Sequence, residues 1–222
     1  MFTGFTRETL EFFMAIRFNN NREFFNENHD WYLRAVRKPL LDLAAELSEA
    51  VGQIDPELER RPERAVSRIN RDIRFSRDKS PYRDWMWIGF HRRENKGGTP
   101  GYFVDISDDH LGWGMGFWED NRPLMRAHRL MLEKAPQEFC EALKSSAGGL
   151  EVSVRAYKRM AVPEQLSDEI KSWYPLRSFY LYGERKDEAG MLDAKLAGFL
   201  QGEFKRMAPL YQYFAGLTPV EE

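Results

Sequence analysis

Apolar residues in the first quarter of the chain recur at the three- to four-residue spacing of an amphipathic helix. The pattern starts after Thr6, a good N-cap residue, and predicts a first helix. A second helical pattern extends to Val51, with Asn20 as its expected N-cap. Pro39 is expected to kink or split that helix, because proline donates no backbone hydrogen bond and clashes with the preceding turn. Residues 1–54 are therefore expected to be helical.

Alternation of large apolar and small or polar residues replaces the helical spacing in the middle of the chain. Segments 85–91, 102–106 and 111–118 favour β-strands, and the glycine, asparagine and aspartate residues between them favour hairpin turns. In the third segment, LGWGMGFW, every second residue is glycine, so one strand face carries no side chains. Such a face lets a helix, another backbone or a ligand approach closely, and a packed helix is the expected occupant.

Helical patterns return after residue 119. Two short strands are expected in this part, at 152–154 and 178–184, and a last helix over 190–210. Helices, then adjacent strands, then helices again are typical of an α+β fold, here with a mainly antiparallel central sheet flanked by N-terminal and C-terminal helices. The sequence has no internal repeat or low-complexity linker, which favours a single domain. Its expected parts are a helical region 1–54, the arginine-rich motif and sheet over 66–118, and a mostly helical region 119–222.

Basic residues are concentrated between Arg60 and Lys96. This segment holds twelve Lys or Arg against five Asp or Glu, a net charge of +7, so the rest of the chain must carry −9 because the whole carries −2. The densest part is Arg68–Arg83, RINRDIRFSRDKSPYR. Like charges packed this closely need partners, which are carboxylates, an anionic ligand or water. A cationic segment in an acidic chain predicts a place where anions concentrate.

Composition restricts the class of protein. Apolar residues make up 42% and charged residues 31% of the chain, as in a soluble globular protein, and the net charge of −2 disfavours a nucleic-acid binder. The apolar runs are too short to span a bilayer and the N-terminus lacks a signal-peptide pattern, so a cytoplasmic location without membrane association is expected. Cys140 is the only cysteine and the four histidines are scattered, so neither a metal nor a cofactor is expected. The acidic turn Asp105–His110 comes nearest to a cation site, but acidic residues are common in turns for their own sake.

The arginine-rich stretch is the best candidate for a functional site, because guanidinium groups bind phosphate and carboxylate oxygens in pairs. Read as a strand over Arg68–Ser76, it places Arg71 in an otherwise apolar row, where a half-buried arginine needs a partner from elsewhere in the fold or from a ligand. Asp72 and Asp78 are the candidate catalytic residues, since they would orient the cations or act as an acid or base. The expected ligand-binding residues are Arg68, Arg71, Arg74, Ser76, Arg77, Lys79 and Tyr82.

Two functions fit this stretch. In the first, a cytoplasmic protein binds a phosphorylated or other anionic small molecule in an arginine-lined cleft, with hydrolase or transferase activity left open. Aromatic residues nearby, such as Trp85 and Trp87, would stack on a ring of that ligand. In the second, the chain is a non-enzymatic protein-interaction module, and its arginines form a structural salt-bridge network with carboxylates such as Glu23, Glu27 or Asp30. The protein partner in that case is not indicated.

Several motifs occur in order along the chain. They are FTGF at Phe2–Phe5, NNNREFF at Asn19–Phe25, the arginine-rich stretch, GYFVDI at Gly101–Ile106 and the glycine-rich strand after it. Together they resemble a widespread family of microbial proteins, domain of unknown function 2461, over most of the chain. The longest motif, R-I-x-R-D-x-R-F-S-x-D-K-x-P-Y, runs from Arg68 to Tyr82, and the resemblance implies a site there without implying a reaction. Family members tend to carry a basic-Pro-Lys-Gly element where this chain has YKRMAVPEQLSDE at Tyr157–Glu169, which lacks the glycine.

Overall fold

A curved antiparallel sheet forms the centre of the molecule. The computed structural model describes residues 1–93 and 98–221, and within them five strands pair in the order β1-β2-β3-β5-β4. The strands are β1 (Met86–His91), β2 (Gly101–Ile106), β3 (Leu111–Phe117), β4 (Glu151–Ala156) and β5 (Leu176–Arg185). Every pairing between neighbours is antiparallel, which confirms the expected α+β fold with a mainly antiparallel sheet.

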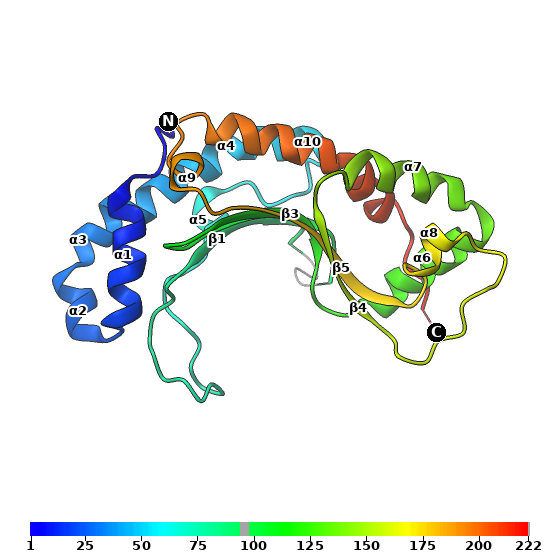
Figure 1. The fold of residues 1–222 in the computed structure, drawn as a ribbon, viewed down its shortest axis with the longest axis horizontal. Helices are drawn as coiled ribbons and strands as arrows, with labels where there is room; N and C mark the ends of the chain where they lie inside the picture. The colour runs from blue at the N-terminus through cyan, green and yellow to red at the C-terminus, as the bar shows by residue number, and fades with distance from the viewer. Residues whose placement is uncertain (94–97, 222) are drawn as a thin grey trace.

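Helices cover the outer face of the arched sheet, where α4 (Lys38–Ile54) and α10 (Leu196–Ala215) run, and its inner face is left open by the described helices (Figure 1). On the outer face, the Trp113 ring of β3 packs edge-on against Phe199 of α10, and its Nε1 donates to Glu203 at 2.9 Å. The outer face is therefore the core side of the sheet. The other helices beyond the N-terminal part are α5 (Pro62–Ala65), α6 (Arg122–Lys134), α7 (Pro136–Ser146), α8 (Asp168–Lys171) and α9 (Glu188–Met191).

The N-terminal part is helical, as the spacing predicted. It contains α1 (Arg7–Phe18), α2 (Arg22–Glu27), α3 (His29–Tyr32) and a π-helical turn η1 (Leu33–Arg37) before α4. Thr6 is the N-cap of α1, as expected. The expected cap of the second helical segment is wrong by one residue, because Asn21 caps α2 by accepting from the Phe24 N–H at 2.9 Å. Asn20 is occupied elsewhere, with both ends of its amide bonded to the backbone of Tyr82.

Pro39 divides the long N-terminal segment, as expected from its missing N–H. It is the second residue of α4, which begins directly after the π-helical turn. In a regular helix the residue at this position would donate to the carbonyl of Ala35. The buried hydroxyl of Thr9 donates to that carbonyl instead, at 2.6 Å, and so ties α1 to the break in the helix.

The last helix starts later than the sequence pattern predicted. Asp187 accepts a hydrogen bond from the N–H of Gly190 and caps the short α9, which ends at Met191, and α10 begins only at Leu196. The aspartate side chain provides a local cap, and this favours a separate turn before the long helix. No helix in the described ranges is long and apolar enough to cross a membrane.

Residues 66–85 form an irregular hairpin that we call the arginine arm. Its two sides meet through a single bridge between Asn70 and Tyr82, so the strand expected over 68–76 is wrong. Beyond that bridge, side-chain oxygens accept hydrogen bonds from backbone N–H groups. Asp72 accepts from the N–H of Arg74 at 3.2 Å, and Asp78 accepts from the N–H of Ser80 at 2.9 Å. Such local bonds compete with strand pairing and leave the arm without a regular ladder.

Candidate functional site

A pocket of about 640 Å³ opens on the inner face of the sheet, and we call it the aromatic pocket. Its aromatic side chains are Trp85, Trp87, Phe103, Trp118, Tyr180 and Tyr182. His91, Asp105 and His110 contribute its polar side chains, and Gly89, Gly101, Gly116 and the buried Tyr102 complete the lining. This volume falls within the range of small-molecule pockets, which is about 300–1,000 Å³.

The floor of the aromatic pocket is flat because glycine alternates with aromatic residues across the strands. Phe103 of β2 lies opposite Gly114 of β3, which lies opposite Tyr182 of β5. The Phe103 and Tyr182 rings are almost parallel, at 16°, with centroids 6.2 Å apart. A Cβ atom added at Gly114 would sit 2.5 Å from Cζ of Phe103, so glycine is what lets that ring lie over the strand. The prediction that a helix packs on the glycine row is therefore wrong.

Asp105 and His110 form the polar end of the aromatic pocket. His110 Nε2 lies 2.9 Å from Oδ2 of Asp105, and His110 Nδ1 lies 2.7 Å from Ser107 Oγ and 3.0 Å from Oδ1 of Asp109. The bond with Asp105 is the main cause that raises the pKa of His110 to about 9; burial opposes it and the bond with Asp109 adds to it. The imidazole is therefore protonated at neutral pH with both nitrogens engaged. It can orient neighbours, but it has no free nitrogen to act as a general base.

Arg83 joins the arginine arm to the aromatic pocket. Its guanidinium carbon lies 4.9 Å from the centroid of the Trp87 ring, within cation–π distance. Its Nη1 donates to the backbone carbonyls of Arg68, at 3.3 Å, and Asn70. Burial, and then the nearby charge of Arg71, lowers the pKa of Arg83. Two guanidinium groups therefore repel each other at the edge of the pocket.

Two other arginines of the arm are paired within the arm itself. Arg71 forms an ion pair with Asp78, and Arg74 holds Asp72 through Nη2 at 2.7 Å and Nε at 2.9 Å. The expectation that a partner for Arg71 comes from elsewhere in the fold or from a ligand is therefore wrong, since the arm supplies one. The guanidinium of Arg74 lowers the pKa of Asp72 to about 2, and that of Arg71 lowers the pKa of Asp78 further. Both carboxylates are ionised at neutral pH, which makes them poor proton donors. In the described part of the chain, the arm forms no ion pair with Glu23, Glu27 or Asp30.

The remaining polar residues of the arm are distributed along it. Lys79 Nζ donates to the backbone carbonyl of Ile73 at 2.9 Å. Ser76 is half-buried, and its N–H also bonds the Ile73 carbonyl, at 3.3 Å. Arg68 and Arg77 are exposed, and neither forms an ion pair with a residue that the structure describes. These two side chains are positioned on the surface where an anion can reach them.

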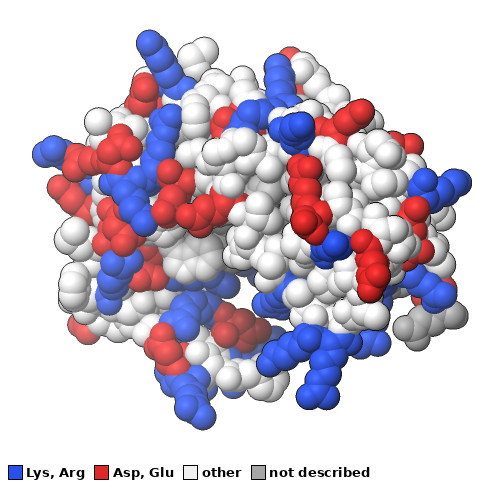
Figure 2. Space-filling view, turned by 45° about the vertical axis from the view of Figure 1, so that its right-hand side comes forward, with Lys and Arg blue, Asp and Glu red and all other residues white. Residues whose placement is uncertain are grey.

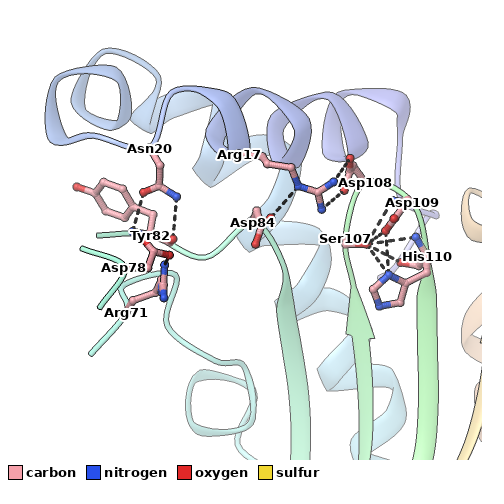
Figure 3. Close-up of polar contacts among 10 residues, drawn as sticks. All are labelled: Arg17, Asn20, Arg71, Asp78, Tyr82, Asp84, Ser107, Asp108, Asp109 and His110. Carbon is pink, nitrogen blue, oxygen red and sulfur yellow. Dashed lines mark hydrogen bonds and ion pairs between the residues drawn. The ribbon is translucent and has the colours of Figure 1, made fainter. Parts of the chain in front are cut away.

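Tyr82 anchors the arm to the N-terminal helices and is buried, with 6% of its surface exposed. Its ring stacks on Phe25 at a centroid distance of 4.2 Å. Asn20 donates to the Tyr82 carbonyl and accepts from the Tyr82 N–H, both at 2.9 Å (Figure 3). The paired bonds act like one more backbone bridge, so the base of the arm is held in one orientation.

Arg17 of α1 ties the arm to the turn between β2 and β3. Its Nε donates to Oδ2 of Asp84 at 2.7 Å, and its Nη1 donates to Oδ2 of Asp108 at 2.9 Å (Figure 3). Asp84 directly precedes Trp85, so this bridge also fixes the start of the pocket wall. The acidic turn is thus used by Arg17 and His110, and no group of three His, Cys, Asp or Glu among the described residues is arranged to hold a metal ion.

One family model matches most of the chain. The model described as "Conserved hypothetical protein (DUF2461)" matches residues 8–213. The chain belongs to this family. The resemblance based on the motifs is therefore confirmed. A search of curated proteins finds no match.

The longest of the motifs on which the resemblance was based, Arg68–Tyr82, forms most of the arginine arm, and Arg83 follows it directly. Sequence reasoning found the arm but missed the floor of the aromatic pocket. Phe103 and Tyr182 were not singled out, although each lies on the face of a predicted strand opposite its buried residues. The glycine row itself is the sequence signal that large residues lie opposite it, because they fill the space that glycine leaves on a neighbouring strand, but which residues these are depends on the strand register.

The basic charge of residues 60–96 is divided between two places in this DUF2461 protein. A second cavity, of about 880 Å³, is lined by Arg60, Arg61, Arg92, Arg93, Glu57 and Glu59 among others. There Arg61 holds the buried Glu59 through Nε at 2.8 Å and Nη2 at 2.5 Å, and Arg92 holds the buried Asp55 at 2.9 Å. Buried carboxylates pair with Arg61 and Arg92 there, and Glu59 also lies 3.4 Å from Arg93, so we place the candidate site at the arm and the aromatic pocket despite the larger volume of the second cavity.

Proposed function

We propose that this protein binds a small molecule that carries both a ring and an anionic group, such as a phosphorylated one. The ring lies on the aromatic pocket, and the anionic group is bound by the arginine arm. The observation that carries the proposal is the contact of Arg83 with Trp87, because Trp87 lines the pocket and Arg83 belongs to the arm. Figure 2 shows basic side chains gathered along the lower edge of one face, on both sides of a hollowed and mostly uncharged strip.

The charges of the arm support an anionic ligand. Arg83 and Arg71 repel each other, and only Arg71 has a carboxylate partner among the residues that the structure describes. An anion between them would relieve that repulsion through bidentate hydrogen bonds. Arg68 and Arg77 add exposed positive charge nearby in the sequence. Electrostatic focusing of this kind raises the local concentration of anions and speeds their association.

The proposal is one of binding rather than of a particular reaction. His110 is held protonated between two carboxylates, and Asp72 and Asp78 are held ionised by arginines. None of the three is tuned to exchange a proton near neutral pH, as an acid–base catalyst requires. The proposal therefore assigns no hydrolase or transferase step to these three residues.

The test is a titration calorimetry series with three probes: inorganic phosphate, glucose-6-phosphate and AMP. We expect the two ring-bearing phosphates to bind more tightly than inorganic phosphate, and Arg83→Gln to weaken all three. Trp87→Leu should weaken the ring-bearing probes more than inorganic phosphate, because it removes a ring contact and keeps the arm charges. Arg34→Ala, which removes a paired arginine of the N-terminal helices, is the control. The proposal would be overturned if no probe bound the wild type, or if Arg83→Gln and Trp87→Leu bound the probes as tightly as the wild type does.

The protein-interaction module is the second candidate function, and the tip of the arm favours it. Phe75 is 95% exposed there, with the guanidinium carbon of Arg74 5.8 Å from its ring centroid. An exposed aromatic ring beside an arginine is the composition of many interface anchors. Under this alternative, Phe75→Ser would abolish a protein contact and leave small-molecule binding unchanged, whereas Trp87→Leu would have no effect on either.

A further inference from the structure

Aromatic rings form the floor of the aromatic pocket. Phe103 and Tyr182 lie nearly parallel over β3, and both are half-buried. The negative π-faces of such rings attract the weakly positive C–H groups of a saturated ring. The tilted pair of Trp85 and Trp87, with centroids 5.0 Å apart, stands beside this floor. A ring that rests on such a platform keeps its edges free for hydrogen bonds.

Two oxygen atoms lie together beside the platform. A Cβ atom added at Gly112 would be within 2.6 Å of Oδ1 of Asp105 and would also meet the hydroxyl of Tyr182, so both oxygens lie over the same glycine. The other carboxylate oxygen, Oδ2, is occupied by His110 Nε2 at 2.9 Å. Oδ1 therefore faces the platform as an acceptor, and the Tyr182 hydroxyl is a donor next to it.

The local electrostatics keep these two oxygens in those roles. Burial, and then the charge of Asp105, raises the pKa of Tyr182, so its hydroxyl keeps its proton. Protonated His110 offsets the charge of Asp105, which lessens the repulsion between that carboxylate and an anionic ligand. An acceptor and a donor side by side match two adjacent hydroxyl groups of a ligand, one donating to Asp105 and the other accepting from Tyr182.

We infer that the ring of the ligand is a sugar ring, whose apolar face rests on Phe103 and Tyr182 and whose adjacent hydroxyl groups bind Asp105 and Tyr182. This inference rests on the proposed function and specifies its ligand class as an anionic sugar, either free or as part of a ribonucleotide. The anionic group extends past Trp87 to Arg83, because Asp105 pairs with Trp87 in the register of β1 and β2. The sugar and the anion thus occupy neighbouring parts of one site.

The test compares AMP with its 2′-deoxy form, and glucose-6-phosphate with inorganic phosphate, on wild type and on Tyr182→Phe. That variant removes a single hydroxyl and keeps the aromatic platform. We expect the deoxy probe to bind the wild type about ten-fold more weakly than AMP, and Tyr182→Phe to lose about the same factor for both sugar probes. Inorganic phosphate should bind both proteins equally. Tyr174→Phe, which removes a hydroxyl bonded to Glu133 outside the pocket, is the control.

The outcomes separate the two levels of the proposal. Equal binding of AMP and its deoxy form, with no effect of Tyr182→Phe, means that a base or another flat ring is recognised; the inference about sugars then falls while the proposed function stands. Binding of neither AMP nor glucose-6-phosphate overturns both. Asp105→Asn is a second variant that keeps the size of the side chain, and it should weaken the sugar probes and leave inorganic phosphate unchanged.

Discussion

The guanidinium group of Arg83 lies over the indole ring of Trp87, 4.9 Å from its centroid. Arg83 belongs to the arginine arm, and Trp87 belongs to β1 and to the wall of the aromatic pocket. The contact therefore makes the cationic arm and the aromatic platform one continuous surface. Its geometry depends on the glycine row beneath the platform, on the bonds that hold the arm, and on the polar end of the pocket.

Gly114→Ala should disturb the platform. The added Cβ atom would clash with the backbone carbonyl oxygen of Leu181 and would sit 2.5 Å from Cζ of Phe103, so it would strain the pairing of β3 with β5 and push that ring off the strand. Overpacking of this kind costs about 1–3 kcal/mol of unfolding free energy, which chemical denaturation measures. Gly202→Ala is the matched control, since nothing lies within 4 Å of a Cβ atom there, and it should leave stability unchanged or raise it. Similar stability of the two variants would contradict the role given to the glycine row.

Asn20→Ala should loosen the base of the arm. The substitution removes both hydrogen bonds to the backbone of Tyr82 and lowers the unfolding free energy by about 1–2 kcal/mol. Hydrogen exchange measured by mass spectrometry should speed up in the arm. Asn19→Ala is the control, because that side chain bonds the Ala15 carbonyl on its own helix. Unchanged exchange in the arm of the Asn20 variant would show that Asn20 does not hold it.

Local patterns predicted those parts of this fold that depend on neighbouring residues. The alternation around Val104 and Met115 is enough to place their strands, because side chains on a strand alternate with a period of two. The conformation of the arginine arm does not depend on apolar alternation. There the carboxylates of Asp72 and Asp78 bond nearby backbone N–H groups and cations, which a periodicity of apolar residues does not reveal.

The candidate site was only partly predictable for a similar reason. The charge of the arm is visible in the sequence, and so is the nearby Trp87. The platform cannot be recognised in the sequence, because Phe103 and Tyr182 are far apart along the chain and meet only through the register of β2, β3 and β5. The burial of Tyr82 likewise depends on the distant Phe25. Whether the predicted residues bind a ligand stays a prediction.

Thr9→Val should destabilise the protein through the carbonyl of Ala35. Without the Thr9 hydroxyl this buried carbonyl loses its donor, at a cost of about 1–3 kcal/mol measured by denaturant unfolding. In a Pro39→Ala background the backbone N–H of residue 39 is available as a substitute donor. The cost of Thr9→Val should therefore be smaller there. Equal costs in the two backgrounds would show that the Thr9 bond does not compensate for the proline.

His110 should make stability depend on pH above neutrality. Its pKa is raised on folding from 6.5 to about 9, so the protonated imidazole stabilises the fold fully below the unfolded value. That stabilisation is lost as pH rises from 6.5 through about 9. Unfolding free energies across this window should fall in the wild type and fall less in His110→Gln. His29→Gln, at an exposed histidine, should keep the wild-type slope. Parallel curves for all three proteins would contradict the assignment.

The central claim is that the arginine arm and the aromatic pocket form one ligand site through Arg83 and Trp87. A double-mutant cycle measures this directly: titration calorimetry of glucose-6-phosphate on wild type, Arg83→Gln, Trp87→Leu and the double variant. Because each residue positions the other, we expect the two losses of affinity to be non-additive, with the double variant losing less than the sum of the two single losses. Strictly additive losses, or no loss in either single variant, would show that the arm and the pocket act separately.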